Sequence, residues 1–309
     1  MPVLAETAYP NKLVKIIVPF PAGGPADTIV RTFGAVLEKR LGQPFIADFR
    51  SGAGATIGSD AVAKSAPDGY ALLATTGDPL VASVAMFKRL PYNPQRDLAL
   101  VAVAGSAPMV FAVNASVPAN DLRQFVAYAK TRPAALSFGS TGAGSLYHIA
   151  GETYLNRVNR LAAVHVPYRG QAPLVQELVG EQITAAFGPA PAFSPFVTQQ
   201  RLRILGVTGP RRLAAMPEVK TFSEQGVLDE VLQLQQWFAF LVPAATPREI
   251  IARLNAEFVR AIDEPEVKAM LETFGFEPLR STPDEARAIF DSNLAVVPRL
   301  IRELGIEPR

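Results

Sequence analysis

The sequence predicts an α/β protein of two domains. Short apolar runs rich in β-branched residues alternate with amphipathic helical segments, a pattern typical of sheets whose strands are connected by helices. A length of 309 residues favours two domains of ordinary size. Two long apolar runs, Leu98–Gly105 and Gln236–Val242, are interpreted as the places where the chain leaves the first domain and returns to it. The expected domains are therefore residues 10–105 with 237–309, and residues 106–236.

The first domain is expected to open with a strand, a tight loop and a helix. Lys15–Pro19 is an apolar run, and Ala26–Leu41 places apolar residues at positions 29, 33, 37 and 41, on one face of a helix. The alternation then continues through a strand at Phe45–Phe49, a helix at Ile57–Ser65 and a strand at Tyr70–Thr75. This order favours parallel strands with crossover helices, in which ligands bind beyond the carboxyl ends of the strands.

The second domain repeats the alternation. After the apolar run Met109–Asn114, the expected elements are the helices Val117–Lys130, Leu146–Val158 and Ala172–Gly180, and the strands Leu136–Gly139, Ala163–Pro167, Ile183–Phe187 and Leu202–Val207. The C-terminal part is expected to be helical. Two capping boxes with proline in the first turn predict helix starts at Thr246 and Thr282, and Gly275 predicts a helix end.

Composition excludes several classes of function. Apolar residues make up 49% of the chain, and the formal net charge of +2 comes without a run of lysines or arginines, so nucleic acid is not an expected partner. The chain has no cysteine and two histidines, so thiol chemistry is excluded and no metal or other cofactor is expected. The apolar runs are the size of strands, shorter than the ~20 residues of a membrane-spanning helix.

The loop from Phe20 to Gly24 is the first candidate binding element. It follows a strand and precedes a helix, so its backbone N–H groups are available to an anion, and its two glycines permit close approach. The candidate ligand-binding residues here are Phe20, Ala22, Gly23, Gly24 and Asp27. Since the carboxylate of Asp27 competes with a bound anion, it disfavours a bulky phosphate.

A second loop of the same kind runs from Gly139 to Ser145. It contains three glycines and the hydroxyls of Ser140, Thr141 and Ser145, and Ser145 is placed to cap the next helix. The lysine of a nucleotide-binding P-loop is missing, so a carboxylate is the better match. His148 lies one turn further on and either donates to a ligand or supports the loop. Thr76 and Gly77 also follow a strand and join the candidate set.

Other candidates have two interpretations each. Gly52–Gly58 resembles a dinucleotide fingerprint but has the wrong spacing, so a structural loop is favoured. Arg169 follows a strand and faces either a ligand or solvent. His165 lies inside an apolar strand and is interpreted as structural. No nucleophile elbow or pair of catalytic carboxylates is present in the sequence.

Several segments in order resemble one known family. They are Pro19–Gly24, Gly52–Gly54, Ala66–Tyr70, Leu90–Pro94, Gly139–Glu152 and Val166–Gly170. Together they resemble the Bug/TctC family, the substrate-binding proteins of tripartite tricarboxylate transporters, over nearly the whole chain. The resemblance implies a two-domain periplasmic-binding-protein fold of type II, with two crossing strands as a hinge and a ligand cleft between the domains.

The resemblance also implies a site and partners. The two loops would grip a carboxylate through backbone groups and ordered water, and Asp27, Thr76, Ser140, Ser145 and His148 would belong to the site or support it. The expected partners are a small carboxylate and the membrane permease subunits, and the protein is expected to be a periplasmic monomer. Met1–Tyr9 lacks the pattern of a signal peptide, and we hypothesise that a starting methionine replaces the signal.

One departure from the family concerns the ligand. After Phe187, where a polar or acidic residue is common, the chain has Gly188–Phe193, which disfavours an amino acid and adds Gly188 to the candidate set. Phe193 and Phe196 either line an apolar pocket, which would accept an aromatic or longer acid, or belong to the core. Two alternatives stay open: an enzyme that acts on a small carboxylate through His148 and a loop serine, and a dinucleotide-dependent enzyme.

Overall fold

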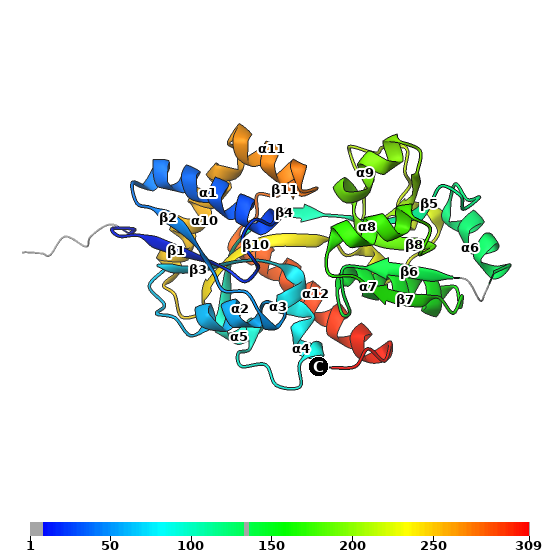
Figure 1. Cartoon of the computed structure of the whole chain (residues 1–309). Coiled ribbons are helices and arrows are strands. Elements are labelled where there is room, and N and C mark those ends of the chain that lie inside the picture. Colours follow the sequence, from blue (N-terminus) through cyan, green and yellow to red (C-terminus); the bar gives the residue numbers. More distant parts are fainter. Residues whose placement is uncertain (1–8, 133–135, 309) are drawn as a thin grey trace, which may run out of the picture. The chain divides into compact units, whose positions relative to one another are not determined.

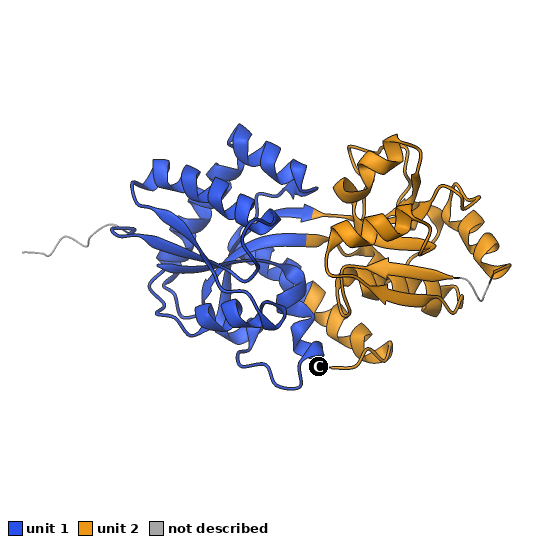
Figure 2. Cartoon of the chain, in the orientation of Figure 1, with its two compact units in different colours: residues 1–106, 237–292 blue, residues 107–236, 293–309 orange. Residues whose placement is uncertain are grey.

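The computed structural model describes residues 9–132 and 136–308, so the expectation for the first eight residues lies outside the described part. The chain forms two compact units (Figure 2). Unit 1 comprises residues up to 106 together with 237–292, and unit 2 comprises 107–236 together with 293–309. Residues 293–309 therefore group with the second unit, whereas the sequence assigned them to the first. Two ion pairs join this segment to unit 2, since Arg299 binds Glu230 and Arg157 binds Glu303.

Strands and helices alternate through both units (Figure 1). The strands are β1 Val14–Val18, β2 Phe45–Phe49, β3 Ala71–Thr76, β4 Leu98–Ala107, β5 Met109–Asn114, β6 Ser137–Ser140, β7 Val164–Pro167, β8 Ala185–Pro189, β9 Leu202–Val207, β10 Gln236–Pro243 and β11 Glu277–Pro278. The α-helices are α1 Pro25–Leu41, α2 Thr56–Ala63, α3 Gly77–Val81, α4 Ser83–Met86, α5 Pro94–Asp97, α6 Leu122–Lys130, α7 Leu146–Gly151, α8 Gln171–Val179, α9 Ala190–Thr198, α10 Arg248–Ile262, α11 Pro265–Thr273 and α12 Pro283–Glu303. Shorter helical segments are η1 Ala53–Ala55, η3 Glu152–Val158, η4 Ser223–Gln225 and η5 Glu230–Gln233.

Unit 1 is built on a six-stranded sheet in the order β11-β4-β10-β3-β1-β2. Strand β1 is parallel to β2 and β3, as the alternation of strands and helices predicts. Strand β10 is antiparallel to β3, so the sheet is mixed and not purely parallel. The difference arises in a strand that does not follow a crossover helix, because β10 carries the chain back from unit 2.

Helices cover both faces of this sheet (Figure 1). Helix α1 lies with α10 and α11 on one face and α2 lies on the other. The predicted apolar face of α1 is confirmed, since Ile29, Phe33 and Leu37 are buried. The ring of Phe33 packs edge-on against Phe240 of β10, with 5.0 Å between the centroids. The loop that precedes α1 is therefore attached to a well-packed helix.

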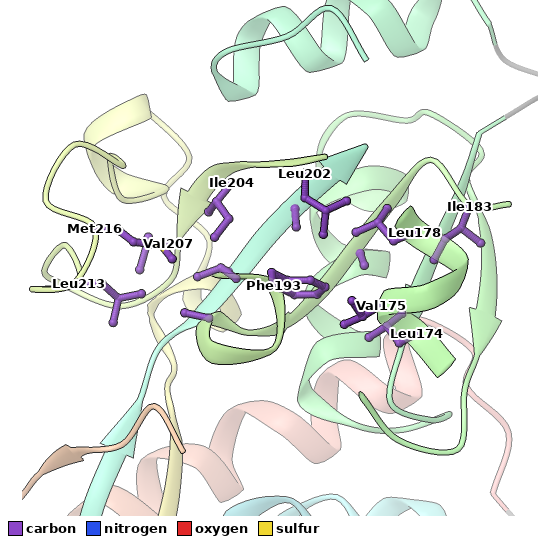
Figure 3. Close-up of a cluster of buried hydrophobic side chains, with 14 residues drawn as sticks. Leu174, Val175, Leu178, Ile183, Phe193, Leu202, Ile204, Val207, Leu213 and Met216 are labelled. Atoms are coloured by element: carbon purple, nitrogen blue, oxygen red, sulfur yellow. The ribbon is translucent and has the colours of Figure 1, made fainter. Parts of the chain in front are cut away.

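Unit 2 is built on a five-stranded sheet in the order β7-β6-β8-β5-β9, and it is also mixed. Successive side chains along its strands point to opposite faces of the sheet and pack into different hydrophobic clusters, as the two-residue period of a strand requires. Val110 and Ala186 face the cluster under α8 and α9 shown in Figure 3. Phe111 and Phe187 contact each other and the ring of Phe222 in an aromatic cluster.

Several boundaries differ from the prediction. Helix α6 begins at Leu122 and not at Val117, because the side chain of Asp121 caps it by accepting from the Gln124 N–H. The helix after Ser145 changes from α to a π-helical stretch at Glu152. The capping box at Thr282 is confirmed by hydrogen bonds in both directions with Glu285.

The capping box predicted at Thr246 is wrong. Pro247 precedes the first residue of α10, and no side-chain hydrogen bond caps this end of the helix in the described structure. The expected end of α11 is confirmed, because Gly275 adopts a φ of 78° just past it.

Candidate functional site

The loop of unit 1 is held by Asp27 of α1. The backbone N–H of Gly23 donates to Oδ2 of Asp27 at 2.8 Å, and Arg31 binds the other carboxylate oxygen. The hydrogen bond from Gly23, followed by the contact with Arg31, lowers the pKa of Asp27 below its ordinary value. Gly23 adopts a φ of 84°, which favours glycine. Asp27 therefore stabilises the loop by occupying one of its N–H groups.

Other N–H groups of the loop stay available. Within residues 9–132 and 136–308, the N–H groups of Ala22 and Ala26 donate to no protein acceptor. Ala22 is exposed, whereas Ala26 is buried in the first turn of the seventeen-residue helix α1, where the helix dipole favours negative charge. Phe20 is half-buried at the end of the strand. The arrangement suits an anion bound by neutral donors.

Thr76 and Gly77 lie where β3 passes into α3. A Cβ atom on Gly77 would lie 2.4 Å from Cε2 of Trp237, so the indole ring requires glycine at this position. Trp237 is buried in β10. Gly77 therefore acts as a packing position under the tryptophan ring, and Thr76 ends the strand beside it.

The hydroxyl groups of the second loop are engaged inside the loop. Ser140 and Ser145 both lie within hydrogen-bond distance of the carbonyl oxygen of Gly142, at 3.1 and 2.8 Å. Ser145 also caps α7 by accepting from the His148 N–H at 3.3 Å, as the sequence predicts. The side chain of Thr141 is half-buried beside them. The two serines thus shape the loop, and Thr141 lies between them.

The contacts of His148 match the second of its two interpretations, support of the loop. It is buried, and its Nδ1 atom accepts from the N–H of Gly144 at 3.0 Å. Its Nε2 atom lies 3.7 Å from a carboxylate oxygen of Glu152, four residues further along the helix.

The sequence interpretation of His165 as structural did not identify its partners in the second loop. Its Nε2 atom lies 2.8 Å from Oγ of Ser140, and its ring stacks on the ring of His148 with 3.6 Å between the centroids. Burial, and then the neighbouring His148, lower the pKa of His165 to about 4. The signal was available in part, because adjacent parallel strands pair Phe138 with His165, two residues before Ser140.

Glu152 was also missed, although its spacing from His148 is that of neighbours on a helix. Burial raises the pKa of Glu152, but His148 and Asn156 outweigh it and bring the pKa below its ordinary value. Asn156 donates to Glu152 at 2.7 Å and also bonds the backbone of Ala163, just before β7. The carboxylate is thereby held under the histidine pair.

The remaining candidates occupy different surroundings. Arg169 is exposed beyond the edge strand β7. A Cβ on Gly188 would lie 2.7 Å from the ring of Phe193, so the glycine makes room for that ring. Phe193 is fully buried in the cluster of Figure 3, with Phe196 packed against it, so both belong to the core. Among the described residues, no cluster of three or more metal-ligand side chains is present.

Comparison with known proteins identifies the family of the chain. The profile of the tripartite tricarboxylate transporter family receptor, TctC, matches residues 29–306. Protein BugT of Bordetella pertussis is 34% identical over 98% of this chain and 92% of its own length. The structure of Rpa4515 from R. palustris with adipate is 27% identical, with a TM-score of 0.82 over 97% of this chain and 100% of that chain. MatC from Rhodopseudomonas palustris with bound malate is 28% identical, with a TM-score of 0.78 over 95% of this chain and 100% of that chain.

The profile covers most of the chain, and the solved structures match it over nearly their whole length. These relatives are substrate-binding proteins, which excludes the two enzymatic alternatives that the sequence left open. The chain therefore belongs to the TctC family of tripartite tricarboxylate transporter receptors, and it is a substrate-binding protein and not an enzyme.

Proposed function

We propose that this protein captures a small carboxylate with the loops Phe20–Asp27 and Gly139–His148 and delivers it to the permease of a tripartite tricarboxylate transporter. The observation that carries the proposal is the exposed loop of unit 1, where the N–H groups of Ala22 and Ala26 have no acceptor among the described residues. Structures at 27% and 28% identity contain adipate and malate, which supports a carboxylate as the anion.

The charges of the loop support a carboxylate over a phosphate. Asp27 places a negative charge beside Gly23, and a dianionic phosphate would be repelled more strongly than a carboxylate. Neutral N–H donors bind a carboxylate without requiring a fixed positive partner.

The far end of the ligand is expected to carry no ammonium group. The end of β8 and the start of α9 consist of Gly188, Pro189 and Ala190, which offer no carboxylate for an ammonium ion. Since Phe193 and Phe196 belong to the core, they supply no aromatic pocket lining. A mono- or dicarboxylic acid therefore matches the site better than an amino acid, and Phe193 and Phe196 give no support for an aromatic one.

Location and assembly are part of the same proposal. We expect the protein to act as a periplasmic monomer that changes shape when the ligand binds. No described helix is long and apolar enough to span a membrane.

Calorimetric titration tests the proposal. Adipate and malate are the probes, and the diamide of adipic acid is the matched control with the same length and no charge. We expect at least one diacid to bind and the diamide not to bind, with the diacid recovered unchanged. Equal binding of acid and diamide would contradict carboxylate capture.

Thermal stability in the presence of the same ligands is a second readout. A ligand present at 100 times its Kd stabilises the folded protein by about 2.7 kcal/mol, which a thermal-shift assay detects. NAD is included in that assay, and stabilisation by NAD with none by the diacids would overturn the proposal.

A further inference from the structure

The stacked rings of His148 and His165 lie directly under the loop of unit 2. Each imidazole holds a different part of that loop. His148 binds the N–H of Gly144 at 3.0 Å, while His165 binds Ser140, whose hydroxyl contacts both the N–H and the carbonyl of Gly142. The rings are nearly parallel, with an angle of 14° between their planes. The shape of the loop therefore depends on two side chains that contact each other.

The hydrogen bonds define the protonation state of His148. A backbone N–H can only donate, so Nδ1 of His148 must carry a lone pair and the proton of the neutral ring must lie on Nε2. That proton faces Glu152, whose oxygen lies 3.7 Å from Nε2. A second proton on His148 would have to enter at Nδ1, where it would face the N–H of Gly144. Gly144 is buried, so its N–H would lose its acceptor without gaining water.

Few negative charges lie near the two histidines to stabilise a positively charged imidazole. Glu152 is the acid that faces the pair from the same helix, and the strands β6 and β8 carry no titratable residue. The acids near η5 are already engaged, because Asp229 binds Arg157 and Glu230 binds Arg299. A proton on His165 would place its charge 3.6 Å from the other ring.

We propose that His148 and His165 are positioning residues for the loop Gly142–Ser145, which keeps its ligand-binding shape only while both imidazoles are neutral. The inference rests on the proposed function, because it assumes that this loop contacts the ligand. Under this proposal, the lowest pH at which the ligand is captured is set by the protein and not by the ligand. A proton that enters at Nδ1 of His148 removes the acceptor of the Gly144 N–H, breaks this bond and releases the loop.

The first test needs no ligand. Nitrogen-15 NMR of the imidazoles in the full chain is expected to show His148 with its proton on Nε2 near neutral pH. On acidification, the amide signal of Gly144 is expected to shift in step with the titration of His148. A proton on Nδ1 of His148 at neutral pH, or titration of His148 with the Gly144 signal unchanged, would overturn the proposal even if no ligand were known.

The second test compares two variants with the wild type in titrations with adipate or malate. His148→Asn keeps an acceptor near the position of Nδ1 but cannot be protonated, whereas His148→Leu removes the acceptor and leaves the Gly144 N–H unpaired. At pH 7.5, we expect His148→Asn to bind the diacid more tightly than His148→Leu does, because only the asparagine can accept from the Gly144 N–H. We expect His148→Leu to bind roughly tenfold to a hundredfold more weakly than the wild type, the range that corresponds to an unpaired buried donor.

The affinity ratio of wild type to His148→Asn is then followed from pH 8 down to the pH at which the NMR experiment shows a second proton on His148, because protonation of the ligand cancels in this ratio. We expect the ratio to fall on the acid side. A constant ratio would overturn the proposal, as would equal affinities of the Asn and Leu variants. If neither diacid binds the wild type, the proposed function fails for these probes, and the NMR titration still decides the role of the pair.

Discussion

Replacing Gly77 with alanine should force the tryptophan of unit 1 out of place. The added Cβ would lie 2.4 Å from Cε2, 2.6 Å from Nε1 and 2.7 Å from Cζ2 of Trp237. Ordinary van der Waals contact begins at 3.4 Å, so the ring or the start of α3 must move by about 1 Å, the difference between 3.4 and 2.4 Å. Trp237 is only 2% exposed and has no solvent side to move into.

The magnitude follows from two opposing effects. Inserting a methyl group into a packed core costs about 1–3 kcal/mol. Alanine gains less than about 1 kcal/mol over glycine as a helix former, and less still in the first turn. Gly77→Ala should therefore lower the free energy of unfolding by about 1–2 kcal/mol.

Urea denaturation followed by fluorescence measures the effect, since Trp237 is the single tryptophan of the chain. Gly24→Ala is the control, because its Cβ would meet nothing closer than the Pro21 carbonyl oxygen at 3.8 Å and its φ is −89°. We expect the control to lose less than about 1 kcal/mol and to keep the wild-type emission spectrum. Wild-type stability and emission in Gly77→Ala would refute the packing described for the ring.

Two further predictions concern the core of unit 2 and the loop of unit 1. Phe193→Ala should lower the free energy of unfolding by about 3–5 kcal/mol in urea denaturation, since the ring is fully buried. The milder Phe193→Leu should keep wild-type affinity for the diacid. A loss of affinity at full stability would place Phe193 in the binding site instead. Asp27→Asn keeps an acceptor for the Gly23 N–H and removes the charge that binds Arg31. Because the pKa of Asp27 is lowered in the folded state, its ionised form stabilises the protein at neutral pH, and this contribution is lost as the pH falls through the lowered pKa. The stability difference between wild type and Asp27→Asn should therefore shrink on acidification, and a difference independent of pH would contradict this role.

Local signals predicted most of the fold. The apolar face of α1, the run Phe45–Phe49 and the cap at Ser145 all depend on neighbours in the sequence, and the structure confirms each of them. The errors occur where a distant contact decides the outcome. Residues 293–309 group with unit 2, to which ion pairs with residues 157 and 230 join them, and no local pattern reveals these contacts.

The candidate site was predictable to a similar extent. Glycines, serines and a following helix located both loops, because each of these signals depends only on residues that are neighbours in the sequence. The partners that hold the loops were harder to find. His165 is separated from Ser140 by 25 residues and reaches it only through the pairing of β6 with β7. The packing role of Gly77 likewise depends on Trp237, far away in the sequence.

The most direct test of carboxylate capture by these loops is a pair of charge substitutions at Ala22. Ala22 is exposed, so Ala22→Glu and Ala22→Gln differ in charge and hardly in size or effect on folding. In calorimetric titrations with the diacid that binds the wild type, we expect Ala22→Glu to lose at least tenfold in affinity and Ala22→Gln to stay within about threefold. That loss should diminish at high salt because exposed charges are screened. Equal affinities of the Glu and Gln variants at low salt would contradict the placement of a carboxylate at this loop.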